Sequence, residues 1–441
     1  MQFDVQFDKK LLLCLAIFAA FSLASFFLPF FSSDEYGYMS SGREIIEGKF
    51  TEIGDVNRFP LFPFVLSTVY SFFGYSELVT KLFLMLLGFL TIILFYEIAK
   101  SAFGQEAAFI PTLIFASNPL FLYLSTRVLT EPLFFLLLLA GVYYLPKALE
   151  SKFSAFTIGL LFAALILTRY IGVLIIPAIV VYLFVSKEYR RISIEKVGLF
   201  ALGGGVIAGL WLWFSYNVTG DPFGLFLRFF SQQTGGLNEA ATFSLPDKLP
   251  LYLIALPFLL LFASPFLWKG VVEFFKGGVQ KNKTLLLAAV VSIVFYLGLE
   301  VYGFFNVALL RYIVPIVPFL ALFAGNVKLP FNLELPFKFG GVVVDKKVLY
   351  AAVMLNLLLA ASVFAFFASY PKYVGYREAG QWAAENCNSF NSNIQKVLKH
   401  YSDKDNDLAG DCTVISGYDG QLSPAVGQQM VFESHGVKVY E

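Results

Sequence analysis

About eleven apolar segments, each long enough to cross the ~30 Å hydrocarbon core of a bilayer, follow one another through the first 370 residues. A segment in lipid must satisfy its backbone hydrogen bonds internally, and a helix does so. The sequence therefore predicts an all-α, polytopic membrane domain over residues 1–370. The predicted spans are 10–31, 79–100, 103–124, 129–147, 153–169, 170–186, 197–218, 249–269, 284–302, 308–326 and 348–369.

Composition supports this class and excludes others. Apolar residues make up 58% of the chain and charged residues 14%, against about 25% charged in soluble domains. The net charge of +1 gives no basic excess that would indicate nucleic acid as a partner. Both histidines, His400 and His435, follow the last predicted span. A histidine base or a histidine-ligated metal is therefore excluded from the membrane domain.

The distribution of Lys and Arg predicts the orientation. If the N-terminus lies inside, the inner ends and loops hold 17 of these residues and the outer ones 9, not counting the tail. Cytoplasmic loops carry the excess of Lys and Arg. An odd number of spans then places the C-terminal tail outside. We expect a cell-membrane protein with a cytoplasmic N-terminus, whose first apolar run is a retained helix rather than a cleaved signal peptide.

Two external loops and a soluble tail complete the predicted organisation. The loop 32–78 contains a short helix beginning near Asp34 and an apolar stretch at 60–73, which suggest two helices lying on the membrane surface. The loop 219–248 is rich in Gly, Gln and Thr, and we expect it to be mobile. Residues 371–441 return to soluble composition and predict a small external α/β domain, with a helix at 376–386 and strands at 412–416 and 430–432.

The three cysteines have different expected roles. Cys14 lies in the first apolar segment and is expected to pack there without reacting. Cys387 and Cys412 both fall in the tail and could form a disulfide if the tail faces an oxidising compartment. Such a bond would stabilise the tail by about 3 kcal/mol.

Charged residues at the predicted outer ends of the spans are candidates for function, because ions at the membrane are costly. Asp34 and Glu35 follow the first span; adjacent carboxylates at a low-dielectric boundary could supply a general base, or could merely cap a helix. Arg58 could bind a phosphate or lie at the interface. Arg127 and Glu131 could form a structural ion pair. Further cations and a tyrosine stand at two other outer turns, Arg169 and the dipeptide Arg311-Tyr312.

Taken together, these residues converge on one membrane face from segments that are distant in the chain. A cluster of arginines, tyrosines and carboxylates at that face suits an anionic lipid headgroup, above all a phosphate.

Two other features of the predicted spans have structural interpretations. Gly203, Gly204, Gly205 and Gly209 lie within a span and indicate close helix packing. Glu300 suggests a hydrogen-bonded structural acid.

The ordered motifs resemble the GT-C superfamily of membrane glycosyltransferases, in the branch of the protein O-mannosyltransferases and the lipid A aminoarabinose transferase. The resemblance covers roughly residues 10–325. Each motif alone is weak evidence for the family, whereas the set of motifs in this order is fairly specific to it. The motifs are Asp34-Glu35-Tyr36-Gly37-Tyr38-Met39, Arg58-Phe59-Pro60-Leu61-Phe62-Pro63, Phe115-Ala116-Ser117-Asn118-Pro119-Leu120-Phe121 leading to Arg127 and Glu131, Leu167-Thr168-Arg169, and Arg311-Tyr312-Ile313-Val314-Pro315.

The resemblance implies roles for these residues. Asp34 would be the base that deprotonates the acceptor, with Glu35 assisting, and Glu131 would match a second acid at which many relatives carry Asp. Arg58 would bind the donor phosphate, where relatives often carry Lys. Further phosphate contacts would be Arg127, Arg311 with Tyr312, and Arg169, where relatives again often carry Lys. Any divalent metal would fall to Asp34, Glu35 and Glu131, although the arginines could neutralise a phosphate without one.

The implied activity is transfer of a sugar from a polyprenyl or dolichyl phosphate to a hydroxyl on a protein, glycan or lipid at the extracytoplasmic face. A base opposite the leaving group favours inversion, by analogy with glycosidases. The oligosaccharyltransferase branch is disfavoured, because the tail has one tryptophan, Trp382, and no Trp-Trp-Asp-Tyr-Gly motif. A transporter or flippase of a lipid-linked anion would instead require charges at the midplane and inverted repeats. A non-catalytic binder of lipid phosphates is a third alternative.

Overall fold

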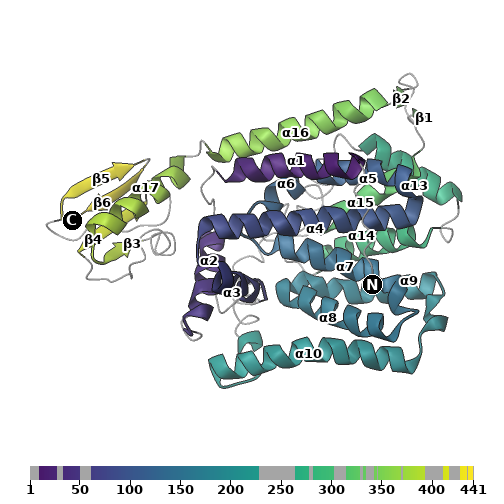
Figure 1. Cartoon of the computed structure of the whole chain (residues 1–441), viewed down its shortest axis with the longest axis horizontal. Helices are drawn as coiled ribbons and strands as arrows, with labels where there is room; N and C mark the ends of the chain where they lie inside the picture. The colour runs from purple at the N-terminus through teal and green to yellow at the C-terminus, as the bar shows by residue number, and fades with distance from the viewer. Residues whose placement is uncertain are drawn as a thin grey trace.

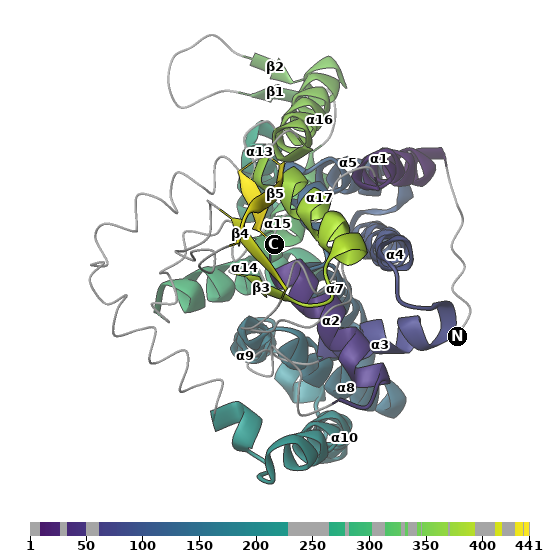
Figure 2. The ribbon, with the colours of Figure 1, turned by 90° about the vertical axis from the view of Figure 1, so that its left-hand side faces the viewer.

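The computed structural model describes residues 9–26, 33–49, 61–227, 264–277, 282–301, 314–327, 331–333, 342–344, 346–368, 371–392, 411–416, 428–434 and 436–440. These residues form a helical body with a small α/β tail at one end (Figure 1). Seen from that end, the tail lies in front of the body (Figure 2). The predicted combination of an all-α domain and a small C-terminal α/β domain is confirmed at this level.

The helices of the body are α1 Lys9–Ser25, α2 Ser33–Ile46, α3 Leu61–Phe73, α4 Glu77–Phe103, α5 Gln105–Ala116, α6 Pro119–Ser125, α7 Glu131–Ala148, α8 Lys152–Thr168, η1 Tyr170–Leu174, α9 Ile175–Val185, η2 Glu188–Arg191, α10 Ile194–Thr219, α13 Ser264–Gly277, α14 Lys283–Val301, η4 Val314–Ile316, α15 Val317–Leu322, η5 Phe323–Asn326 and α16 Lys346–Ala368. A short antiparallel pair, β1 Phe331–Leu333 and β2 Val342–Val344, precedes α16.

Membrane-spanning length is clearest in three of the described helices. These are α4, α7 and α10, and the bent pair α5 and α6 makes a fourth, broken span. Most other predicted spans correspond to shorter apolar helices, at Lys152–Thr168, Tyr170–Val185, Lys283–Gly298, Val314–Asn326 and Leu349–Ala365. The predicted span at 249–269 lies mostly outside the described residues, as does most of the loop 219–248. The body is thus a multi-pass membrane domain.

Helices α2 and α3 occupy the predicted loop between the first two spans, at the same end of the body as the tail (Figure 1). They pack against each other through Tyr38, whose ring meets Phe62 edge-on with centroids 5.5 Å apart. Gly42 allows the close approach, because a Cβ there would lie 3.1 Å from the Cβ of Leu66. Their position on the membrane surface stays a prediction.

The segment predicted as a single span at 103–124 forms two helices, α5 and α6, with a bend of 66° between them. Asn118 caps α6 by accepting hydrogen bonds from the N–H groups of Leu120 and Phe121, both at 3.1 Å. Pro119 follows it at the start of the helix, where its missing N–H costs nothing. Phe115 and Phe121 pack across the bend with centroids 4.2 Å apart. The bend is therefore encoded locally, and it redirects the chain into the turn at 126–130.

Close packing of α8 on α10 depends on glycine, as the Gly-rich run predicted. A Cβ on Gly203 would lie 2.2 Å from the carbonyl oxygen of Phe156, and one on Gly159 would lie 2.1 Å from that of Phe200. Gly205 and Gly209 do not contribute, because a Cβ on either meets no described atom within 4 Å. The helical repeat places these two glycines on a different face of α10, so the prediction of packing is wrong for them.

Replacing Gly203 with alanine should therefore destabilise the protein, by about 1–3 kcal/mol as for other overpacked cores. The clash is with backbone, which no side-chain rotation relieves. Gly205→Ala makes the same chemical change on the same helix in open space, and should leave the thermal midpoint unchanged or slightly raised. Tryptophan fluorescence during heating of both variants measures the difference; equal midpoints would contradict the packing described here.

The tail consists of α17 Pro371–Asn386 and a four-stranded sheet of order β3-β4-β6-β5. The strands are β3 Phe390–Ser392, β4 Cys412–Ser416, β5 Met430–Ser434 and β6 Val437–Tyr440, and only β3 and β4 pair in parallel. Helix α17 packs on the sheet, with Trp382 stacked on Phe432 at 5.6 Å. The predicted helix and both predicted strands are present.

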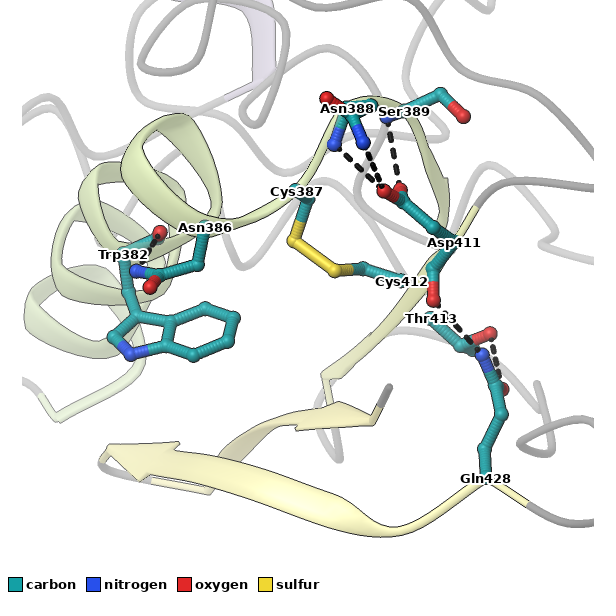
Figure 3. The surroundings of a disulfide bond; sticks show 9 residues. All are labelled: Trp382, Asn386, Cys387, Asn388, Ser389, Asp411, Cys412, Thr413 and Gln428. Carbon is teal, nitrogen blue, oxygen red and sulfur yellow. Dashed lines mark hydrogen bonds between the residues drawn. A yellow bond between two sulfur atoms is a disulfide. The ribbon is translucent and has the colours of Figure 1, made fainter.

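A disulfide and the carboxylate of Asp411 fasten the start of β4 to the end of α17 (Figure 3). Cys387 and Cys412 form a disulfide across 25 residues, whereas Cys14 forms no disulfide and is buried in α1, as predicted. Asp411 accepts hydrogen bonds from the backbone N–H groups of Asn388 and Ser389, at 2.8 and 2.9 Å. Burial alone would raise the pKa of Asp411, but these hydrogen bonds hold it below the usual value.

Removing the disulfide should lower the free energy of unfolding of the tail by about 3–4 kcal/mol, as expected for a loop of this length. The double variant Cys387→Ser/Cys412→Ser in the full chain should be cut by trypsin in the tail much faster than wild type. A reducing agent should accelerate cleavage of wild type and of the control Cys14→Ala, but not of the double variant. Insensitivity of wild type to reduction would contradict a stabilising bond.

Candidate active site

The start of α2 and the turn before α7 are joined by a buried ion pair. Glu35 is 1% exposed, and one of its carboxylate oxygens accepts from Nη2 of Arg127, which is 3% exposed. The other oxygen accepts from the backbone N–H of Val128 at 3.1 Å. The Arg127 guanidinium also lies 5.8 Å from the ring centroid of Tyr123. A buried carboxylate with both oxygens engaged is held in one orientation.

Asp34 lies beside this pair, in the first turn of α2. Its side chain is half-buried, whereas that of Glu35 is fully buried. The N-terminal turn of a helix favours a negative charge, because the backbone N–H groups there point outward. Of the two adjacent acids, Asp34 is thus the one that a bound molecule can reach.

A second ion pair lies at the other end of the same turn. Glu131 begins α7 and is 2% exposed, and its Oε1 meets Nη1 of Arg169. Arg169 follows the last residue of α8, and its Nη1 also donates to Oγ1 of Thr130 at 3.3 Å. The ion pair between Arg127 and Glu131, one of the alternatives that the sequence left open, does not form. Because Arg127 precedes α7, in the turn, it reaches α2, and Glu131 is left to Arg169.

Lys81 is a further candidate for the active site. In the sequence it contributes only to the count of Lys and Arg that predicts the orientation of the spans. It lies in the second turn of α4, is 6% exposed, and places Nζ 3.4 Å from the carbonyl oxygen of Phe26 and 3.9 Å from the carboxylate of Glu77. It is within electrostatic range of Glu35 and Arg127, and of Arg377 from the tail. A lysine four residues into an apolar span is the signal that could have found it.

The structure thus brings Glu35, Arg127, Glu131 and Arg169 together around one turn, with Asp34 beside them. The remaining predicted phosphate ligands, Arg58, Arg311 and Tyr312, lie outside the described residues, as does the side chain of Glu300. Within the described part, no group of three or more His, Cys, Asp or Glu side chains is arranged to hold a metal ion. The acids at the turn are paired with guanidinium groups instead.

Residues 57–214 match the model of the dolichyl-phosphate-mannose-protein mannosyltransferase family. This range contains Lys81, Arg127, Glu131 and Arg169, and ends near the end of α10. A search among curated proteins found no match.

Solved structures match the fold over almost the whole chain. ArnT from Cupriavidus metallidurans bound to undecaprenyl phosphate aligns with a TM-score of 0.68 at 14% identity, covering 97% of each chain. Its apo form gives 0.67 at 16% identity with the same coverage. The oligosaccharyltransferase AglB from Archaeoglobus fulgidus, in complex with an inhibitory peptide and a dolichol-phosphate, gives 0.50 at 11% identity over 89% of this chain and 64% of that one. The family match and the shared fold confirm the resemblance of this chain to the GT-C glycosyltransferases.

Proposed function

We propose that this protein transfers a sugar from a polyprenyl phosphate to an acceptor hydroxyl, at the membrane face where α2 meets the turn before α7. The observation that carries the proposal is the buried Glu35–Arg127 pair beside the accessible acid Asp34. Burying an ion pair costs desolvation energy that apolar residues would not cost, so a buried pair at this position is expected to serve a function. The pair also lies in a fold whose solved examples include one with undecaprenyl phosphate and one with a dolichol-phosphate.

The proposed reaction gives each of these charges a role. Asp34 accepts the proton of the acceptor hydroxyl, whose oxygen attacks the anomeric carbon of the sugar. The bond from that carbon to the phosphate oxygen breaks, and the polyprenyl phosphate leaves with the electron pair. A base on the side opposite the leaving group gives inversion, as in inverting glycosidases. Cations fixed in a water-poor site stabilise the charge that develops on the phosphate.

The two ion pairs divide the remaining roles. Arg127 and Arg169 are each engaged with a carboxylate, so we assign them first to positioning Glu35 and Glu131. A guanidinium carries five N–H donors, so each can also donate to a phosphate oxygen. We assign a direct contact with the phosphate to Lys81, a buried cation within electrostatic range of Glu35 and Arg127. The resemblance to the family implies that Arg58, Arg311 and Tyr312 also contact the phosphate.

We propose that this face is extracytoplasmic. The excess of Lys and Arg at the opposite loop ends favours that orientation, and the Cys387–Cys412 disulfide in the tail suits an oxidising compartment. The acceptor is a protein, glycan or lipid hydroxyl. No step above requires a metal, although a divalent ion at Asp34, Glu35 and Glu131 is the alternative, and dependence of the rate on added chelator tests it.

A panel of radiolabelled polyprenyl-phosphate sugars, offered to the purified protein in lipid nanodiscs, tests the proposal. We expect one donor to be bound and consumed with release of the polyprenyl phosphate. Donor binding is measured separately, because a missing acceptor would suppress transfer alone. Movement of the intact donor across the bilayer would favour the transporter or flippase instead. Binding without consumption in the presence of every acceptor class would favour a non-catalytic binder.

A further inference from the structure

A cavity lined by both charged and apolar side chains lies at the opposite end of the helical body from the candidate active site. It measures about 360 Å³ and is lined by residues of α4, α7, η2 and α14, among them Ser101, Lys147 and Arg191. Ser101 is twenty residues beyond Lys81 on α4, which is about 30 Å along a helix. The cavity therefore lies at the other surface of the membrane.

Four of the five charged groups that line this cavity neutralise one another. Glu188, which is buried, pairs with Lys283 and with Nη1 of Arg191 at 3.0 Å, and Arg191 reaches Glu150 at 3.2 Å. The hydrogen bond from Lys283 holds the pKa of Glu188 below its usual value against the opposing effect of burial. Both acids are thus matched by cations at neutral pH.

Lys147 is the fifth charged group and leaves the cavity with one unit of positive charge. Its Nζ lies 3.6 Å from the ring centroid of Tyr143 and 5.3 Å from that of Tyr144. Among the described residues, no carboxylate lies within 4 Å of it. The two rings hold the ammonium group in place but cannot neutralise it.

A second cavity, of about 290 Å³, adjoins the first and is apolar. It lies between α7, α8, α9 and α10, and Leu149 lines both cavities. Ile192 and Lys196 also line the apolar cavity. Ile192 directly follows Arg191, which lines the first cavity. The Nζ of Lys196 donates a hydrogen bond to the carbonyl oxygen of Leu149 at 2.5 Å. A charged recess thus opens beside a space suited to hydrocarbon.

We propose that the two cavities form a binding site for a phospholipid with net negative charge, from the leaflet opposite the active site. The phosphodiester binds at Lys147 with Arg191 beside it, and one acyl chain enters the apolar cavity. Basic pockets between transmembrane helices bind anionic headgroups in this way. Lys147 supplies the surplus positive charge that a phosphodiester would neutralise, and Lys196 adds a second cation beside it, whereas Glu150 and Glu188 would repel a more highly charged group.

The test measures lipid binding by the full-length protein, so that its outcome is independent of the proposed transferase activity. Nanodiscs of phosphatidylcholine receive increasing fractions of phosphatidylglycerol, and retained lipid is counted by native mass spectrometry. Lys147→Gln should weaken phosphatidylglycerol binding about tenfold, since it removes one charge-assisted contact. Lys147→Arg should retain binding. Lys152→Gln is the matched control, because Lys152 pairs with Glu195 at 2.5 Å at the same end of the body and lines neither cavity.

A second pair of variants tests the acyl-chain cavity. Val180 and Val181 are both exposed, at 47% and 42%, but only Val180 lines the cavity. Val180→Phe should reduce phosphatidylglycerol binding severalfold, and Val181→Phe should not. Equal losses for Lys147→Gln and Lys152→Gln would overturn the proposal in favour of diffuse surface attraction. Full competition by inorganic phosphate, or unchanged binding in Lys147→Gln and Val180→Phe, would overturn it as well.

Discussion

Asp34→Asn should reduce sugar transfer by about 10²-fold or more while leaving donor binding nearly intact, because a general base contributes about 10²–10⁴-fold. Asparagine keeps the size of the side chain and its capacity to accept a hydrogen bond from the helix N-terminus. Only the ability to take a proton is lost. The rate of release of polyprenyl phosphate, under conditions that saturate the donor, measures the effect.

Glu47→Gln is the matched control for this variant, because Glu47 follows the end of α2 and pairs with Arg43 at 2.6 Å on a partly exposed surface. We expect transfer by Glu47→Gln to equal that of wild type. If Asp34→Asn also kept the wild-type rate, Asp34 would be a helix-capping residue, and the base would have to be sought elsewhere.

Arg127→Met should lower the free energy of unfolding by about 3–5 kcal/mol, because it leaves the Glu35 carboxylate buried without a counter-charge. Transfer should fall with it, since Glu35 loses the partner that orients it. Adding Glu35→Gln to Arg127→Met should restore most of the stability: a neutral amide needs no counter-charge, and its oxygen can still accept from Val128 N–H. The thermal midpoint and the transfer rate of the two variants are measured side by side.

Arg43→Met is the corresponding control on α2. Its ion pair with Glu47 is partly exposed, and exposed pairs contribute about 0–1 kcal/mol. If Arg127→Met cost no more than Arg43→Met, the buried pair would have no special structural role. If the double variant recovered transfer along with stability, Glu35 and Arg127 would serve folding alone.

The sequence predicted which residues gather but not how they pair. Alternation of the spans across the membrane placed Glu35, Arg127, Glu131 and Arg169 on one face, and the structure brings them together there. Arg127 and Glu131 stand four residues apart, as an ion pair on one helix would. Their actual partners are 92 and 38 residues away in the chain, and only the packing of α2 and α8 around the turn selects them.

The bend between α5 and α6 was missed for a different reason. Hydropathy over 103–124 is continuous, so the run was predicted as one span, although Asn118-Pro119 is a recognisable helix boundary. This bend positions the turn that carries Arg127. For the Gly-rich run, the apolar context predicted close helix packing, which is correct for Gly203. It did not show which face of the helix each glycine occupies, so the prediction failed for Gly205 and Gly209.

Photocrosslinking of a polyprenyl phosphate with a reactive group next to its phosphate tests the central claim most directly, because it locates the donor on the chain without requiring turnover. The account predicts labelled peptides from the start of α2, from the turn 126–130 and from the first turns of α4 around Lys81. These labels should disappear in competition with unmodified polyprenyl phosphate. Competable labelling confined to the opposite end of the body, around Lys147 and Lys283, would contradict the account.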